Sequence, residues 1–144
     1  MSITGTYDDA NIFAKILRRE IPCVSIMEDD VALAFMDLFP QTRGHCLVIP
    51  KDVRARNFLD FPREKIGPYM ERVQRVALAV EKALKPDGIM VGQFNGAPAG
   101  QTVYHLHFHV LPRYEGAPMK GHGQAPQADK AELEATAKLI AAAL

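Results

Sequence analysis

The sequence predicts one α+β domain in which helices pack on a five-stranded, mainly antiparallel sheet. A chain of 144 residues suits a single domain, so we expect one domain over residues 1–144. Five short apolar runs bounded by Gly, Pro or Asp have the character of strands: residues 24–28, 31–37, 45–49, 89–94 and 104–113. Three longer segments repeat apolar residues at helical spacing: residues 7–20, 54–84 and 129–144.

The composition is that of a soluble globular protein, with 48% apolar residues and 17 basic against 17 acidic side chains. This balance gives no positive field for a nucleic-acid polymer, so a bound nucleotide is expected to be a small molecule. Cys23 and Cys46 form no C-x-x-C motif, which argues against a disulfide scaffold or a cysteine zinc site. Residues 1–7 lack the features of a signal peptide and no run approaches about 18 apolar residues, so we expect a cytoplasmic protein without a membrane partner.

The first predicted helix, residues 7–20, is short and amphipathic. Asp8 or Asp9 can cap its start, and Pro22 ends it. Its apolar positions at helical spacing are Ile12, Phe13, Ile16 and Leu17. Taken alone, such a helix most often serves as a cover for a sheet.

The predicted strands at 24–28 and 31–37 form a hairpin that turns at Asp29 and Asp30. In the second strand, Phe35 and Asp37 point to the same face, so the carboxylate could bind ribose hydroxyls beside a stacked base. A solvated aspartate at the end of a strand is the plainer interpretation. In the next strand, His45 shares a face with apolar residues, where a lone histidine is usually a core residue with one hydrogen bond.

The long helix within residues 54–84 is expected to become regular near Pro68, because proline is tolerated in a first turn. Its apolar stripe is Tyr69, Val73, Val76, Ala77, Val80 and Leu84. Residues 86–88 then turn the chain into the strand at 89–94, which should pair with the strand at 104–113.

The C-terminal part is predicted as a surface linker over residues 115–128, rich in Gly and Pro, followed by the helix at 129–144. Within the linker, His122 is expected to be solvated, although it could reach a substrate phosphate if the loop folds over a cleft. Asp129 is a plausible helix cap. The expected apolar edge of the last helix is Leu133, Ala137, Ile140 and Leu144.

The chemistry is concentrated in residues 104–113, Tyr-His-Leu-His-Phe-His-Val-Leu-Pro-Arg. Strict alternation predicts a strand with His105, His107 and His109 on one face and large apolar residues on the other. A fixed neutral imidazole can attack phosphorus and form a covalent intermediate. Three imidazoles on one face could also bind a metal ion, or they could be ordinary surface histidines.

The loop before the histidines favours phosphorus over a metal. Residues 95–102, Asn-Gly-Ala-Pro-Ala-Gly-Gln-Thr, supply glycines, amides and a hydroxyl, and such loops can bind anions through backbone N–H groups. A metal site would favour carboxylates, and none lies between Gly88 and Arg113. Hydrogen-bond donors beside imidazoles suit a phosphate ester.

Residues 100–113 resemble the signature of the histidine-triad (HIT) superfamily of nucleotide hydrolases and transferases, in which a Gly-Gln-Ser/Thr lead-in precedes His-apolar-His-apolar-His. Two further stretches are similar to this family, residues 11–30 and residues 43–51. The resemblance covers a core of about residues 11–113. The N-terminal half is similar to the Hint and bacterial branches, and the flanks of the histidines are similar to the Fhit branch as well.

The resemblance implies a HIT-like fold, a homodimer and hydrolysis or transfer at the α-phosphorus of a purine nucleotide derivative, such as a phosphoramidate or a dinucleoside polyphosphate. It makes His107 the nucleophile that forms a nucleotidyl-histidine intermediate. The residues expected to supply protons and donors to the phosphate are His105, His109, Asn95, Gly100, Gln101 and Thr102. Matching positions place the base at Phe13, Ile16 and Phe35, the ribose at Asp37, and His45 in a supporting role near the site.

We expect no cofactor and no structural metal, because Asn11 and Ala14 stand where many bacterial relatives carry zinc-binding cysteines. Two other classes of protein stay open. One is a metal-dependent hydrolase with His105, His107 and His109 as ligands. The other is a nucleotide-binding adaptor whose catalysis is vestigial. The leaving group and the choice between adenine and guanine are left open by the sequence.

Overall fold

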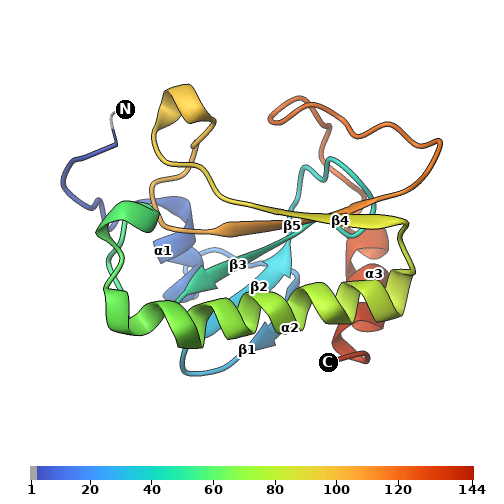
Figure 1. Ribbon diagram of the computed structural model, residues 1–144, viewed down its shortest axis with the longest axis horizontal. Coiled ribbons are helices and arrows are strands. Elements are labelled where there is room, and N and C mark those ends of the chain that lie inside the picture. Colours follow the sequence, from blue (N-terminus) through green and yellow to red (C-terminus); the bar gives the residue numbers. More distant parts are fainter. Residues whose placement is uncertain (1–2) are drawn as a thin grey trace.

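The computed structural model describes residues 3–144 and contains one five-stranded antiparallel sheet (Figure 1). The strand order across the sheet is β1-β2-β3-β5-β4. The strands are β1 (Ser25–Glu28), β2 (Ala32–Met36), β3 (Cys46–Pro50), β4 (Gly88–Gly92) and β5 (Phe108–Arg113), and every neighbouring pair is antiparallel. The predicted α+β class, the five strands and the pairing of β4 with β5 are confirmed.

Two helices pack on one face of this sheet, α2 (Ile66–Leu84) and α3 (Lys130–Ala141), and the short α1 (Ile12–Leu17) packs on the other. Figure 1 shows α2 running along the sheet, with α3 beside one end of α2. Three single turns of 3₁₀ helix complete the structure: η1 (Phe58–Asp60), η2 (Arg63–Lys65) and η3 (Ala97–Ala99).

Strands β2 and β3 are buried on both faces, because each face has its own apolar cluster. Toward α2 and α3 they contribute Ala32, Ala34, Met36, Cys46 and Val48. Toward α1 they contribute Leu33, Phe35, Leu47 and Ile49. The period-2 alternation of a strand therefore separates a structural core from the face that carries the candidate site.

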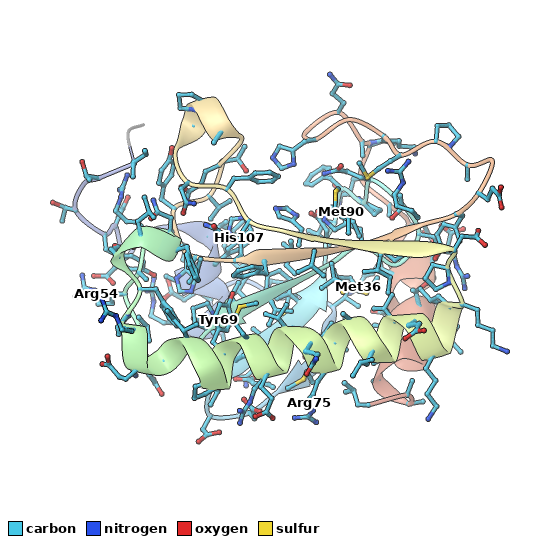
Figure 2. All side chains as sticks on the ribbon, in the orientation of Figure 1. Met36, Arg54, Tyr69, Arg75, Met90 and His107 are labelled. Atoms are coloured by element: carbon cyan, nitrogen blue, oxygen red, sulfur yellow. The ribbon has the colours of Figure 1, made fainter. Side chains whose placement is uncertain are left out.

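Helix α2 begins at Ile66, so Pro68 lies in its first turn as predicted. Tyr69 is fully buried between α2 and the sheet (Figure 2), and its hydroxyl donates to the carbonyl of Val48 at 2.6 Å. The predicted stripe is confirmed except at Ala77, which is only partly buried, whereas Ala79 is buried.

Helix α1 is shorter than predicted at both ends. Its cap is Asn11, whose side chain accepts from the backbone N–H of Ala14 at 2.9 Å, so the predicted cap at Asp8 or Asp9 is wrong. Asp8 instead accepts from Ala10 in a turn before the helix. The helix ends at Leu17, ahead of Pro22, because the backbone at Arg19 turns to a positive φ of 63°.

Strand β5 starts at Phe108, so the prediction that His105 and His107 lie on a regular strand is wrong. The ladder with β3 extends only from Val110 to Phe108, and Leu106 before it donates its N–H to the carbonyl of Ala55 at 2.9 Å. The alternation of sides nevertheless persists, because the Leu106 side chain is fully buried in the α2 core. The pairing of β5 with β3 therefore stops at Phe108, whereas the alternation that directs apolar side chains into the core continues back to Leu106.

The chain from 114 to 129 contains no helix or strand beyond an isolated bridge from Tyr114 to Ala117. It is fastened to the segment that follows β2, since Lys120 donates to the carbonyl of Gln41 at 3.0 Å and Ala128 to that of Leu38 at 2.9 Å. No helix within residues 3–144 has the length and apolar character needed to cross a membrane.

Helix α3 is capped by Asp129, as predicted, through a bond from the N–H of Glu132 at 3.2 Å. Leu133, Ala137 and Ile140 are buried as expected, and Thr136 joins them. The expected place of Leu144 on this edge is wrong, because the helix ends at Ala141 and Leu144 is 46% exposed.

Candidate active site

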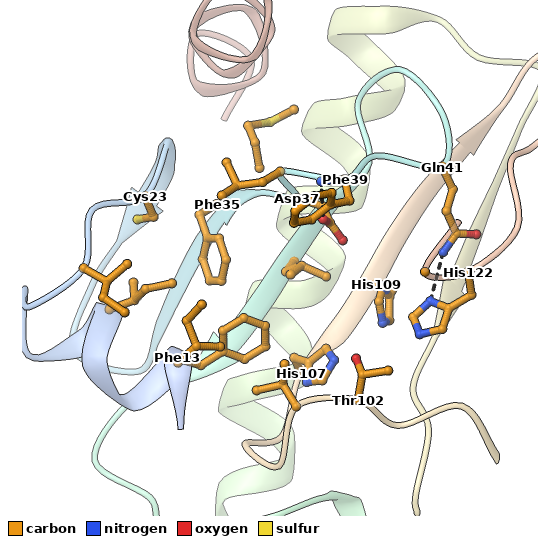
Figure 3. A pocket seen from close by; sticks show the side chains of 18 of the residues that line it. Phe13, Cys23, Phe35, Asp37, Phe39, Gln41, Thr102, His107, His109 and His122 are labelled. Carbon is orange, nitrogen blue, oxygen red and sulfur yellow. Dashed lines mark hydrogen bonds between the residues drawn. The ribbon is translucent and has the colours of Figure 1, made fainter. Parts of the chain in front are cut away.

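A cavity of about 440 Å³ opens on the α1 face of the sheet (Figure 3), a size typical of small-molecule sites. We call one part of it the apolar end, formed by Ile12, Phe13, Ile16, Ile21, Pro22, Cys23, Phe35 and Leu47. We call the other part the histidine end, formed by Gln41, Thr102, His107, His109, His122 and Gly123. Asp37 lines the cavity where β2 ends.

The register of the sheet connects the two ends. Phe35 on β2 is opposite Leu47 on β3, and Leu47 is opposite His109 on β5. Directly opposed residues share a face, so these three side chains form a row across the sheet from the apolar end to the histidine end. The next position along the row is Gly92 on β4, which has no side chain.

Phe13 of α1 completes the apolar end and reaches the nucleophile candidate. Its ring meets Phe35 edge-to-face at 5.5 Å and His107 at 4.9 Å, with the latter planes at 85°. Phe13, Ile16 and Phe35 are each less than 10% exposed. Large apolar side chains thus form a slot next to the imidazole of His107, which fits a flat aromatic base.

His107 has its two ring nitrogens in different roles. Nδ1 lies 2.7 Å from the carbonyl oxygen of His105, which can only accept, so Nδ1 carries the proton. In the neutral ring, Nε2 then holds the lone pair. The side chain is 7% exposed, and burial lowers the pKa of His107 below its usual 6.5, which favours this neutral form at pH 7. A neutral imidazole with a free Nε2 is the nucleophilic form.

His105 supports His107 from behind and does not line the cavity. The hydroxyl of Tyr7 donates to its Nδ1 at 2.6 Å, and its Nε2–H donates to the carbonyl of Pro50 at 3.1 Å. Burial lowers the pKa of His105 to about 4, so the ring stays neutral. Both nitrogens are occupied, and the backbone carbonyl of His105 is held in position to orient His107.

His45 and His109 form a second ordered pair. The N–H of Gln41 donates to Nδ1 of His45 at 3.1 Å, so the proton of His45 is on Nε2 and is donated to Nδ1 of His109 at 2.9 Å. His109 must then carry its own proton on Nε2. Burial lowers the pKa of His45 to about 4 and that of His109 to about 2.

Nε2 of His109 is buried and has no partner among the residues that the structure describes. Buried N–H groups are nearly always paired, and an exception on a ring that lines a cavity points to a ligand. This N–H can donate to an oxygen of a bound phosphate or to a leaving atom. His45 was expected to support the site, and through this pair it orients the donor.

Asp37 follows the end of β2, with one carboxylate oxygen accepting from the N–H of Phe39 at 2.8 Å. Its other oxygen is 3.4 Å from Nε2 of His45. The Asp37 side chain is 19% exposed, so it is open to a polar ligand group at the mouth of the cavity.

One group within residues 3–144 has the spacing of a metal site: Asp37, His45 and His109, whose ligand atoms lie within 4.8 Å of one another. This group differs from the metal site considered from the sequence, which consisted of His105, His107 and His109. Both ring nitrogens of His105 are hydrogen-bonded elsewhere, to Tyr7 and Pro50. A metal at Asp37, His45 and His109 would have to displace the proton that His45 and His109 now share. The expectation of no metal stays a prediction.

Three of the four loop residues predicted to bind phosphate already have hydrogen-bond partners within the protein. Gln101 is 3% exposed; its amide oxygen accepts from Gly96, and its nitrogen donates to the carbonyls of Arg56 and Val103. The Gly100 N–H donates to Ala97 at 2.9 Å. These groups shape the loop, and the positive φ of 108° at Gly100 favours glycine there.

Asn95 is also held by the fold, since its side-chain oxygen accepts from the N–H of Phe58 at 3.0 Å and from Gln93 at 2.8 Å. Neither Asn95, Gly100 nor Gln101 lines the cavity, whereas Thr102 does. Thr102 is exposed, and Figure 3 shows it beside His107 and His109. It is the loop residue placed to meet a phosphate.

His122 is exposed, as predicted, and it also lines the cavity, because the loop does fold over it (Figure 3). Its Nδ1 accepts from the amide nitrogen of Gln41 at 3.1 Å. Its ring contacts Phe94 at 5.5 Å and His109 at 5.6 Å. The glycines on both sides of His122 signalled only a loop, and no signal marked Gln41, Phe94 or Tyr7.

The sequence model of the HIT domain matches residues 18–116. A crystal structure of a Hit-like protein from Bartonella henselae, described as involved in cell-cycle regulation, has a TM-score of 0.88 and 50% identity, covering 96% of this chain and all of that one. Adenosine 5'-monophosphoramidase HNT1 of Saccharomyces cerevisiae is 41% identical over 78% of this chain and 68% of its own length. Adenylylsulfatase HINT3 of Arabidopsis thaliana is 34% identical over 78% of this chain and 56% of its own length.

Proposed function

The chain belongs to the HIT domain family, and we propose that it is a nucleotide hydrolase or transferase acting at the α-phosphorus of a purine nucleotide derivative. The observation that carries this proposal is the hydrogen bond from Nδ1 of His107 to the carbonyl of His105. It leaves the lone pair on Nε2 of a buried, neutral imidazole that lines a nucleotide-sized cavity.

In the first step, Nε2 of His107 attacks the α-phosphorus, and the bond from phosphorus to the leaving group breaks. The product on the protein is a nucleotidyl-histidine. Negative charge on the non-bridging oxygens needs donors, and the Nε2–H of His109 and the hydroxyl of Thr102 are the nearest candidates. An amine leaving group takes up a proton as it departs, which His109 can deliver from Nε2. The ring of His109 is then anionic until the second step, and the hydrogen bond from Nε2–H of His45 to its Nδ1 stabilises that charge.

In the second step, water attacks phosphorus and the bond to Nε2 of His107 breaks. The water loses a proton, the nucleoside monophosphate is released, and the neutral imidazole is restored. After giving up its proton, His109 has a free Nε2 that can take one from the water, so one residue serves as acid and then as base. If an alcohol or another acceptor replaces water, the same intermediate leads to transfer.

The apolar end supports recognition of a purine between Phe13, Ile16 and Phe35, and Asp37 at the mouth supports recognition of the ribose hydroxyls. The two relatives, a monophosphoramidase and an adenylylsulfatase, support a substrate with an activated adenosine phosphate. No step of this mechanism uses a metal or a cofactor.

A rapid-quench reaction with an adenosine phosphoramidate tests the proposal. A transient adduct should appear whose mass equals the protein plus one nucleoside monophosphate, on a peptide containing His107. A phosphorus–nitrogen bond should be labile to acid and stable to mild base. Turnover without any adduct, or an adduct on Thr102, would contradict the covalent role of His107.

The His107→Ala variant distinguishes an enzyme from an adaptor. Turnover should fall by several orders of magnitude, whereas AMP binding should persist, because the base and ribose contacts are untouched. If the wild-type protein binds AMP but turns over neither a phosphoramidate, a dinucleoside polyphosphate nor an adenylyl sulfate, the adaptor interpretation is favoured instead. We further propose a homodimer and a cytoplasmic location.

A further inference from the structure

His122 is the one titratable residue at the histidine end that the proposed mechanism does not use. It comes from the loop after β5, and its ring lies 5.6 Å from that of His109 and faces it edge-on. Figure 3 shows it on the side of His109 away from Phe13 and Phe35. A substrate that holds its base at Phe35 and its phosphorus at His107 therefore directs its leaving group toward His122.

Gln41 fixes this arrangement. The residue is 6% exposed, and its backbone N–H, its backbone carbonyl and its side-chain nitrogen all have partners in the site or the loop. Its N–H donates to His45, its carbonyl accepts from the N–H of Lys120, and its side-chain nitrogen donates to His122. The position of His122 is thus tied to the same residue that orders the His45–His109 pair.

The bond from Gln41 also sets the chemistry that His122 presents. Because its Nδ1 accepts, the neutral ring carries its proton on Nε2. The histidine end then presents three donors, the Nε2–H of His122, the Nε2–H of His109 and the hydroxyl of Thr102. The single carboxylate that lines the cavity is Asp37, which follows β2 and is bonded to Phe39.

This composition favours one class of leaving group. A departing ammonium or lysine amine would be stabilised by a carboxylate, and the histidine end has none among its lining residues. A departing sulfate or phosphate carries negative charge on several oxygens, and hydrogen-bond donors positioned beside those oxygens stabilise such charge. Because Phe94 contacts the rings of both His109 and His122, these donors stay close together.

We propose that His122 forms a leaving-group subsite for a tetrahedral oxyanion, and that its Nε2–H binds an oxygen of the sulfate or phosphate that leaves the α-phosphorus. This inference rests on the proposed function and names the substrate class within it. In the reaction, the bond from phosphorus to the bridging oxygen breaks and that oxygen keeps the electron pair. Sulfate departs without needing a proton, so a hydrogen bond suffices, whereas an amine must be protonated.

The test compares three adenosine substrates that differ only beyond the α-phosphorus: adenylyl sulfate, diadenosine tetraphosphate and adenosine 5'-phosphoramidate. In His122→Ala, kcat/KM for adenylyl sulfate should fall about 10- to 100-fold, corresponding to the loss of one hydrogen bond to a charged group. The fall for the phosphoramidate should be at least tenfold smaller. His122→Asn retains a donor and should recover part of the loss.

Gln127→Ala is the matched control, because Gln127 is exposed on the same loop and does not line the cavity. It should leave all three substrates unchanged. Equal losses for all substrates in His122→Ala, or no loss for any, would overturn the subsite. If His122→Ala lowers kcat/KM for diadenosine tetraphosphate but not for adenylyl sulfate, the subsite is overturned for a sulfate leaving group and retained for a phosphate leaving group.

The proposed function and the subsite fail in different ways. If the wild-type protein turns over none of the three substrates, the proposed function fails. If it turns them over and His122→Ala does not change their ratio, the subsite alone fails. Circular dichroism and thermal unfolding of each variant show whether the loop substitution has disturbed the fold.

Discussion

Nε2 of His45 lies 2.9 Å from Nδ1 of His109, and this hydrogen bond dictates which nitrogen of His109 faces the substrate as a donor. The order is set from outside the pair, because the N–H of Gln41 occupies the other nitrogen of His45. A backbone N–H cannot accept a hydrogen bond, so the direction of both bonds is fixed: Gln41 donates to His45, and His45 donates to His109. The catalytic competence of His109 therefore depends on a residue that has no direct contact with phosphorus.

His45→Ala should remove this control. Without His45, Nδ1 of His109 is free to hold the proton, and the fraction of the ring with Nε2–H falls. We expect kcat to fall about 10- to 100-fold with a much smaller change in KM, as for loss of a positioned acid–base group. In the wild-type protein, nitrogen NMR of the histidine rings should show Nδ1 of His109 unprotonated and Nε2 protonated.

The control is His45→Gln, because its side-chain amide can still donate toward Nδ1 of His109 and should retain more activity than alanine. A wild-type His109 protonated at Nδ1, or an unchanged kcat in His45→Ala, would contradict the assignment.

Adenine and guanine should be accepted with little discrimination. The apolar end consists of hydrocarbon and aromatic side chains together with Cys23, so few polar groups would be left unpaired by the wrong base. Pockets of this kind separate ring edges weakly. Calorimetric titration with AMP and GMP should give dissociation constants within about a hundredfold of each other. A larger ratio would mean that a polar group contacts the base edge.

The alternation of residues in the sequence predicted the two faces of the sheet because it reports burial directly. Phe35 and His109 were each placed on the site face by period-2 patterns in their own strands. The same pattern could not predict that β5 would start at Phe108, since strand length depends on where the partner strand β3 stops pairing. Helix α1 shows the same limit, because Asp8, Asp9 and Asn11 are all acceptable caps.

The supporting contacts of the site were not predictable, because they join residues with no common pattern. Tyr7 and His105 are 98 positions apart, and Gln41 and His122 are 81 apart. Neither pair has a spacing rule, and a tyrosine before a helix or a histidine between glycines has many ordinary roles. Gln101 shows the converse: a loop rich in donors suggested phosphate binding, but the amide of Gln101 is used within the protein, where it accepts from Gly96 and donates to the carbonyl of Arg56.

Folding stability should fall as the pH is lowered below about 6.5. Burial lowers the pKa of His45 and His105 to about 4 and that of His109 to about 2, whereas the unfolded chain has the usual value of 6.5. Between those values the unfolded chain binds more protons than the folded one. The stability is therefore complete above pH 6.5 and decreases toward pH 4. A pKa of 4 in place of 6.5 corresponds to about 3 kcal/mol for one histidine.

Urea unfolding at pH 7.5, 6.0 and 5.0 measures this loss. His105→Asn removes one buried imidazole, so its free energy of unfolding should be lower at pH 7.5 but should change less steeply with pH. Equal slopes for the wild-type protein and His105→Asn would show that His105 does not contribute to the acid sensitivity.

The last prediction concerns the exposed edge of the sheet. Strand β4 pairs with β5 on one side and with no other strand in residues 3–144. Met90 and Val91 on β4 are 42% and 44% exposed, although apolar residues on a free edge favour pairing with another chain. If two copies join through β4 in the proposed homodimer, the same residues meet across the two-fold axis. Lysines at positions 90 and 91 of the two copies would repel each other, and they would prevent the β4 edges from pairing.

The double variant Met90→Lys/Val91→Lys should therefore be a monomer by size-exclusion chromatography with light scattering, where the wild-type protein should have the mass of two chains. Leu139→Lys is the matched control, because Leu139 is a 50% exposed apolar residue on α3, away from β4. It should leave the dimer intact. A double variant that keeps the mass of two chains, or dissociation caused by Leu139→Lys alone, would exclude β4 as the interface.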